Sequence, residues 1–88
     1  MLTPQEKSKV IEKFKRHKED TGSEEVQIAL LTKEIERLLL HLKKHSKDFH
    51  SKRGLLKMVA KRKKLLNFLK KEDVRRHNKV IKEIGLKK

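Results

Sequence analysis

The sequence predicts an all-α protein of four helices, three packed as an antiparallel bundle beside a more mobile N-terminal helix. Charged residues make up 43% of the 88 residues, while the chain has only three glycines, one proline and three aromatic residues. This composition favours long helices with solvated faces over strands and tight turns. Apolar residues also recur at helical spacing, and helix-capping residues precede them. We therefore expect one helical domain spanning residues 1–88.

A first helix is predicted to begin near Pro4. Thr3 supplies a hydroxyl at the N-cap and Glu6 follows three residues later, which is the capping-box arrangement, and proline suits the first helical position. The apolar stripe covers barely two turns and consists of Val10, Ile11 and Phe14. Because so narrow a stripe makes a helix marginal alone, we expect this helix to dock loosely.

The second helix is predicted to begin after Ser23, its N-cap, and to end near His45. A break over residues 18–23 precedes it, and Gly22 in this break is free to adopt a backbone geometry that other residues resist. The apolar residues of this helix are spaced 3, 4, 3 and 4, as in a helix packed along a partner, and are Ile28, Leu31, Ile35, Leu38 and Leu42. The connection to the third helix is about six residues long, which predicts antiparallel neighbours.

The third helix is predicted to begin at Asp48 or Ser51, either of which can serve as N-cap. Its expected buried side consists of Leu55, Val59, Leu66 and Leu69, with Leu56, Met58 and Leu65 beside them. Residues 61–64 place four cations around one turn, so at least one of them must lie near the core and extend outward. A break near residues 72–73 precedes a last helix with apolar Val74, Val80, Ile81 and Ile84, which Gly85 is expected to stop.

The positive charge lies mostly in the second half of the chain. Residues 1–45 carry ten Lys or Arg against eight acids, and residues 46–88 carry sixteen against four, within a net charge of +14. This asymmetry favours an anionic partner, nucleic acid before a membrane surface, because the apolar faces are committed to the bundle. The chain has no cysteine, and we expect a soluble, cytoplasmic protein without a cofactor or metal.

A cluster of polar side chains is predicted where the second helix turns into the third. His41 and His45 share a helix face, and Asp48 and Ser51 follow three and six residues after His45. One interpretation is helix capping by Asp48 and Ser51 alone. A zinc site of His41, His45, Asp48 and His50 is disfavoured by the surrounding lysines, and a hydrolytic triad lacks a glycine-rich turn for an oxyanion hole.

Nucleic-acid recognition is the leading interpretation of this cluster. A carboxylate among cations does not help to bind phosphate, but it can accept hydrogen bonds from base amino groups. Imidazole and hydroxyl groups suit the base edges and 2′-hydroxyls of the wide RNA minor groove. The expected phosphate contacts are Lys43, Lys44, Lys47, Lys52, Arg53 and Lys64. DNA remains an alternative ligand.

The residues also resemble a known family. The chain resembles the bacterial-type small-subunit ribosomal protein S15 family at the following positions: Asp20-Thr21-Gly22-Ser23, residues 25–32, His41, His45, Lys47-Asp48, Ser51, residues 53–56, Val59 and Leu65-Leu66. The resemblance runs from about residue 4 to the C-terminus. It implies a non-enzymatic protein that binds the central domain of small-subunit ribosomal RNA early in assembly, alongside other small-subunit proteins. It also implies repression of its own messenger RNA in some members and a location near large-subunit RNA. We expect the free protein to be a monomer.

The resemblance assigns two groups of RNA contacts. Thr21, Gly22 and Gln27, with the aromatic Phe68, would approach a three-way RNA junction. His41, Asp48 and Ser51 would read a minor-groove site on an adjacent RNA helix. Position 68 is commonly tyrosine in the family, Lys52 stands where arginine is usual, and Glu34 occupies a site that is basic in some relatives.

Overall fold

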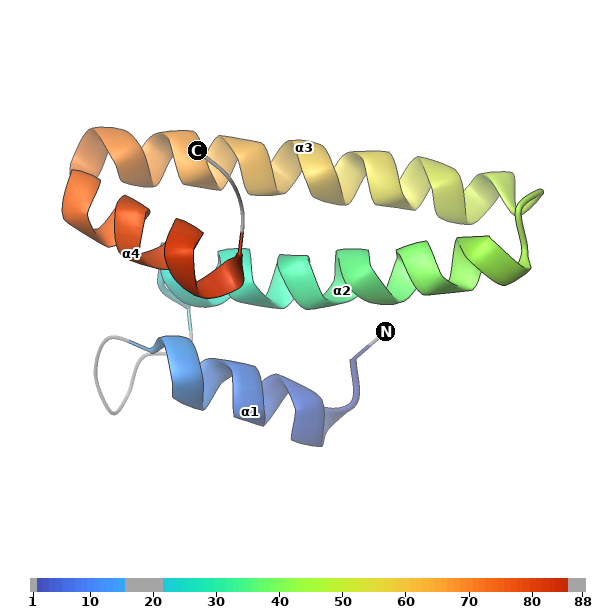
Figure 1. The fold of residues 1–88 in the computed structure, drawn as a ribbon, viewed down its shortest axis with the longest axis horizontal. Helices are drawn as coiled ribbons and strands as arrows, with labels where there is room; N and C mark the ends of the chain where they lie inside the picture. The colour runs from blue at the N-terminus through green and yellow to red at the C-terminus, as the bar shows by residue number, and fades with distance from the viewer. Residues whose placement is uncertain (1, 16–21, 86–88) are drawn as a thin grey trace.

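The computed structural model describes residues 2–15 and 22–85, and the chain forms four helices there. They are α1 (Pro4–Phe14), α2 (Glu24–Lys44), α3 (Phe49–Glu72) and α4 (Val74–Ile84). The long helices α2 and α3 run antiparallel as a hairpin (Figure 1). Helix α4 turns back from the end of α3 and packs against the half of the hairpin that contains the start of α2, while α1 packs against α2. The predicted four-helix, all-α class is confirmed.

The helix ends follow the capping residues in the sequence. Thr3 forms the predicted capping box with Glu6, and the Ser23 hydroxyl accepts a hydrogen bond from the backbone N–H of Val26. Asp48 is the N-cap of α3, which decides between the two candidates predicted for that position. Gly85 ends α4 with a φ of 78°, a left-handed conformation that glycine adopts without a steric cost.

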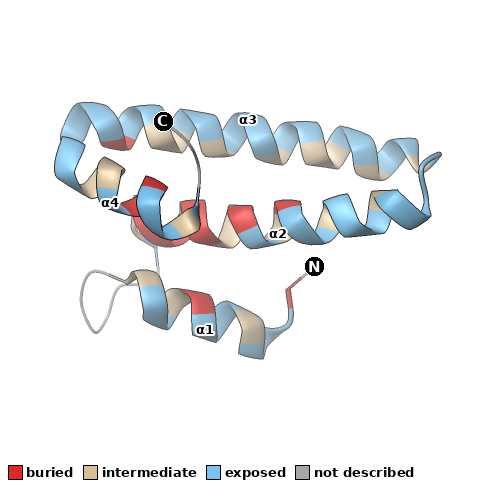
Figure 2. Cartoon of the chain, viewed as in Figure 1, coloured by how far each residue is buried: buried red, intermediate tan, exposed pale blue. Residues whose placement is uncertain are grey.

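The hydrophobic core lies in the half of the hairpin that α4 covers (Figure 2). Ile28 from α2, Leu69 from α3 and Val80 from α4 are its buried centre. Toward the connection between α2 and α3 the burial decreases, because α4 is only 11 residues long against 24 for α3. Among the described residues, the part of the hairpin nearest this connection therefore consists of α2 packed against α3.

Two residues expected on the buried side of α3 are exposed. Leu56 is 70% exposed and Val59 is 40% exposed, so the prediction was wrong for both. The apolar stripe of α3 is wider than the single face that α2 covers, and α4 does not extend far enough along α3 to cover the remaining flank. Leu69 is fully buried, and Leu65 and Leu66 pack against the core as expected.

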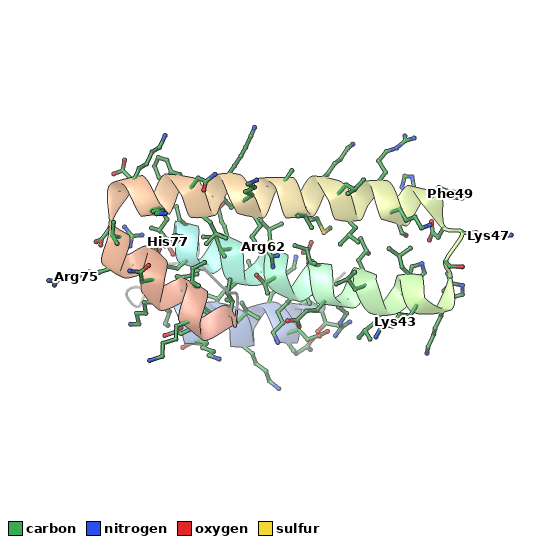
Figure 3. The ribbon with its side chains drawn as sticks, turned by 45° about the horizontal axis from the view of Figure 1, so that its top comes forward. Lys43, Lys47, Phe49, Arg62, Arg75 and His77 are labelled. Atoms are coloured by element: carbon green, nitrogen blue, oxygen red, sulfur yellow. The ribbon has the colours of Figure 1, made fainter. Side chains whose placement is uncertain are left out.

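Arg62 is the cation of the 61–64 run that lies near the core. It extends from α3 toward α2 (Figure 3), where its Nη1 donates a 3.2 Å hydrogen bond to the hydroxyl of buried Thr32. That hydroxyl in turn donates to the Ile28 carbonyl at 2.8 Å. The expected inward cation is confirmed, and this contact joins α3 to α2.

Helix α1 is docked on α2 in this structure. Leu2 and Val10 are buried, and Glu6 pairs with Arg37 of α2. The greater mobility expected for this helix stays a prediction. Within the described part of the chain, none of the helices combines the length and apolarity needed to span a membrane.

Candidate RNA-binding surface

Asp48 is the centre of a hydrogen-bonded cluster at the hairpin tip, defined as residues 41–51. One carboxylate oxygen, Oδ1, accepts from the backbone N–H of Ser51 at 3.0 Å, which is the cap of α3. The other, Oδ2, accepts from the Ser51 hydroxyl at 2.7 Å and lies 2.8 Å from His41 Nε2. The three residues expected to read an RNA minor groove are thus brought together, although α2 and α3 supply them from opposite sides of the connection.

These hydrogen bonds stabilise the charged form of Asp48. The Ser51 hydroxyl, the Ser51 backbone N–H and His41, in decreasing order of effect, hold the pKa of the Asp48 carboxyl well below its usual range. The Asp48 side chain is still 32% exposed and that of His41 is 42% exposed. The cluster therefore combines a fixed negative charge with access from solvent, which suits an acceptor of hydrogen bonds from base amino groups.

His45 lies beside this cluster. Its ring centroid is 4.7 Å from that of His41, with the planes tilted by 33°. His45 is also the C-cap of α2, and its backbone N–H donates to the carbonyl of His41. Among the described residues, no three His, Asp or Glu side chains gather as ligands for a metal ion. The alternative zinc site thus has no ligand set in this part of the chain.

The turn before α2 holds the second group of expected contacts. Thr21 lies outside the described residues. The amide of Gln27 donates from Nε2 to the Gly22 carbonyl at 2.8 Å, so the side chain folds back over the turn.

Gly22 has open space beside its Cα, where another residue would carry its side chain. Among the residues that the structure describes, a Cβ added at Gly22 would meet no atom within 4 Å. Packing against the described residues therefore does not require glycine here. Close approach of a partner is a remaining physical reason for glycine at such a position.

Phe68 lies at the same end of the hairpin as Gly22 and Gln27. Phe68 is six residues after Arg62, and Gln27 is five residues before Thr32, so the Arg62–Thr32 bond places the two residues at nearly the same level of the antiparallel pair. Phe68 is 50% exposed, next to fully buried Leu69. An exposed ring fixed by a buried neighbour can stack on a base.

A row of cations on α3 connects the two ends of the hairpin. We call these five cations, together with the uncharged Phe68 that lies among them, the basic stripe: Arg53, Lys57, Lys61, Lys64, Phe68 and Lys71. Successive members are separated by 4, 4, 3, 4 and 3 residues, so they share one helix face, and all are exposed. At 1.5 Å per residue the stripe is about 27 Å long. Such a row of cations suits the phosphates of a nucleic-acid backbone.

Comparison with known proteins identifies the family. The model of the family described as Ribosomal protein S15 matches residues 7–87. The chain belongs to the ribosomal protein S15 family. Proteins named small ribosomal subunit protein uS15 are similar to it: that of Dictyoglomus thermophilum is 55% identical over 87 residues, covering 99% of this chain and 98% of the relative. That of Caldanaerobacter subterraneus subsp. tengcongensis is 54% identical over 88 residues, covering all of both chains.

The six phosphate contacts expected from the sequence do not share one face of this S15-family chain. Arg53 and Lys64 belong to the basic stripe, whereas Lys47 lies at the tip of the hairpin (Figure 3). Neighbouring residues of a helix project about 100° apart, so Lys43 and Lys44 diverge on α2, and Lys52 diverges from Arg53 on α3. All six side chains belong to exposed residues.

Sequence reasoning missed four residues of this surface. Lys57, Lys61 and Lys71 complete the basic stripe, and the helical spacing of cations on α3 could have identified them. Phe49, directly after the N-cap, is 69% exposed at the tip, and the Lys52 ammonium lies 5.0 Å from its ring centroid. An aromatic residue outside the apolar stripe of its helix was the available signal for Phe49.

Proposed function

We propose that this protein binds small-subunit ribosomal RNA at two points and fixes the angle between RNA helices at a three-way junction in the central domain. Membership of the family makes the chain a non-enzymatic structural component of the small ribosomal subunit in the cytoplasm, where it associates with ribosomal RNA and other subunit proteins. By holding one arrangement of the junction, it would nucleate assembly and allow later proteins to bind.

The hydrogen-bonded state of Asp48 carries this proposal. A protein that binds only phosphate gains nothing from a carboxylate inside a field of net charge +14. In this chain the carboxylate is kept ionised and is oriented by His41 and Ser51, while a third of it remains exposed. This arrangement favours hydrogen bonding to base amino groups in an RNA minor groove, with lysines and arginines holding the flanking phosphates.

The length of the hairpin supports binding at two separate points. Helix α2 has 21 residues, which places Gly22 and the tip about 30 Å apart. The two points belong to a pair of packed helices, so their separation is fixed by α2 and α3 and does not depend on a flexible linker. A rigid spacer of this kind selects RNA conformations in which both binding sites are presented at the matching distance.

Two further roles come from the family resemblance alone. We propose that the protein represses translation of its own messenger RNA where that RNA presents a similar binding site, and that it lies near large-subunit RNA in the ribosome. No described residue is assigned to either role.

A comparison of two glycine variants tests the junction contact. Gly22→Ala is compatible with the described part of the fold, because the added Cβ meets none of its atoms within 4 Å. Gly54→Ala is the matched control, since its Cβ would lie 3.9 Å from Leu38 Cδ2, an ordinary contact, far from the turn. If RNA approaches Gly22 closely, Gly22→Ala lowers affinity for a three-way junction RNA about tenfold, while Gly54→Ala leaves that affinity unchanged.

The RNA ligands for this test are the central-domain three-way junction and the same RNA with one arm of the junction removed. Both variants should bind the truncated RNA like the wild type, because the tip contacts remain. Circular dichroism melting confirms that the variants are folded. Equal affinity of Gly22→Ala and wild type for the intact junction would contradict the contact at this turn.

A further inference from the structure

The first turn of α2 is joined to α4 by an ion pair that no RNA-contact role explains. Glu25 is 7% exposed, and both of its carboxylate oxygens accept hydrogen bonds from Arg76: Nε donates at 2.6 Å and Nη2 at 2.5 Å. The same Nη2 lies 3.5 Å from the carboxylate of Glu24. One guanidinium thus holds both acids of the first turn of α2, in the two-pronged geometry that arginine and carboxylate favour.

Arg76 is itself held in place by the end of α3. Asp73 is at once the C-cap of α3 and the N-cap of α4, and its Oδ1 accepts from the backbone N–H groups of Arg75 and Arg76. The backbone N–H of Asp73 donates to the carbonyl of Leu69 at 2.8 Å. A continuous set of bonds therefore runs from α3, beside Phe68, through Asp73 and Arg76 to Glu25.

This set of bonds connects the two segments that the proposed junction contact needs. Gln27 and Gly22 lie on either side of Glu25 in the chain, and Phe68 precedes Leu69. The groups come from segments more than 40 residues apart in sequence, and these segments also meet in the core, where Ile28 and Leu69 are buried together. A bidentate ion pair adds a directional constraint that apolar packing lacks.

We propose that Arg76, paired with Glu25, is a positioning residue that sets the 22–27 turn against Phe68 for recognition of the RNA junction. The inference rests on the proposed function, because it concerns how that function's second contact point is built. Arg76 acts through Glu25 and does not itself touch RNA. Its guanidinium also offsets the charge of two carboxylates that would otherwise repel a phosphate backbone near the turn.

The test uses Arg76→Lys, which keeps the positive charge and removes the two-pronged geometry. Arg75→Lys is the matched control, since Arg75 is the neighbouring residue, is exposed, and points away from the bundle (Figure 3). Binding is measured with the three-way junction RNA and with the truncated RNA that lacks one arm. We expect Arg76→Lys to bind the junction about tenfold more weakly, with affinity for the truncated RNA within twofold of wild type, and Arg75→Lys to match wild type with both RNAs.

Glu25→Gln separates positioning from direct contact. This change removes a negative charge, so electrostatics alone predicts tighter RNA binding. Loss of the paired geometry predicts weaker junction binding, of similar size to Arg76→Lys, and no additional loss in the double variant. A loss in Arg76→Lys with none in Glu25→Gln would mean that Arg76 contacts RNA directly and would overturn the proposal.

The remaining outcomes distinguish failure of the positioning role of Arg76 from failure of the proposed function on which that role rests. Equal loss with both RNAs would show a general effect on folding and would refute the positioning role. Melting curves identify a variant that fails to fold, and the apolar pair Glu25→Leu with Arg76→Met then replaces it, with the same expected loss of junction preference. If the wild-type protein does not prefer the junction RNA to the truncated RNA, the proposed function itself is contradicted. If the wild type has this preference and Arg76→Lys keeps it, only the positioning role of Arg76 is contradicted.

Discussion

Replacing Asp48 with asparagine or alanine separates helix capping from RNA reading. Asparagine is as good an N-cap as aspartate, and its amide oxygen can still accept from the Ser51 backbone N–H. It puts an N–H donor where Oδ2 now accepts from the Ser51 hydroxyl and meets His41. Alanine removes the cap and the acceptor together. Both variants thus lose the carboxylate proposed to read RNA bases, but only Asp48→Asn keeps the N-cap of α3.

The expected magnitudes differ for folding and for binding. Loss of an N-cap lowers the Tm of a domain of this size by about 5 °C, so Asp48→Ala should melt lower than Asp48→Asn. Loss of one base contact lowers specific affinity roughly 5- to 150-fold, and both variants should show it. Binding to an RNA helix without the specific site should hold or rise, because each variant removes a negative charge.

The assay is a titration of the central-domain junction RNA and of a plain RNA helix at one fixed salt concentration. Glu12→Gln on α1 is the control, since it removes the same charge from an exposed position away from the tip. The control should bind both RNAs equally well or slightly more tightly than wild type. Tighter specific binding by Asp48→Asn would refute the reading role and leave capping as the function of Asp48.

The lowered pKa of Asp48 gives this residue a pH signature. A carboxyl whose folded pKa lies below its unfolded value of about 3.9 contributes stability above that value and loses it as pH falls toward the folded pKa. The difference in Tm between wild type and Asp48→Asn should therefore not decline from pH 7 to about pH 4 and should shrink below that. Equal Tm of the two proteins at every pH would show that Ser51 and His41 do not hold the carboxylate in solution, and a decline between pH 7 and pH 5 would show that the pKa of Asp48 is not lowered.

Further predictions concern the basic stripe and the buried arginine. Lys64→Ala or Arg53→Ala should weaken binding to all RNAs and lower the slope of log affinity against log salt by about 1. Lys7→Ala on α1 is the control and should leave the slope unchanged. An unchanged slope in Lys64→Ala or Arg53→Ala would remove that residue from the phosphate contacts. Arg62→Ala should reduce the free energy of unfolding, measured by urea denaturation, by about 1–2 kcal/mol, because packing and the hydrogen bond to Thr32 are lost. Lys63 is exposed, so Lys63→Ala should change this free energy by no more than about 0.5 kcal/mol. Equal effects of the two substitutions would contradict the role of Arg62 in the core.

The order and limits of the helices could be predicted because their signals are local. Thr3, Ser23 and Gly85 act within a few residues of the helix ends that they define. The exposure of Leu56 and Val59 could not be predicted in this way, because it depends on how far α4 reaches along the hairpin. Periodicity identifies an apolar stripe but does not show how much of it a short neighbouring helix covers.

In the candidate site, too, the local contacts could be predicted from the sequence and the long-range contacts could not. His41, Asp48 and Ser51 lie within 11 residues, so their meeting at one turn follows from helix geometry and the short connection. The pairing of Arg76 with Glu25 spans 51 residues and depends on the packing of α4, which no local pattern encodes.

The most direct test of the central claim compares a three-way RNA junction with duplex DNA at matched salt. If the protein reads an RNA minor groove and a junction, it should bind the junction RNA at least about a hundredfold more tightly than the DNA. Asp48→Asn should remove most of this difference in affinity. Equal affinity for the two nucleic acids, falling in parallel as salt rises, would show that charge alone governs binding and would contradict the account.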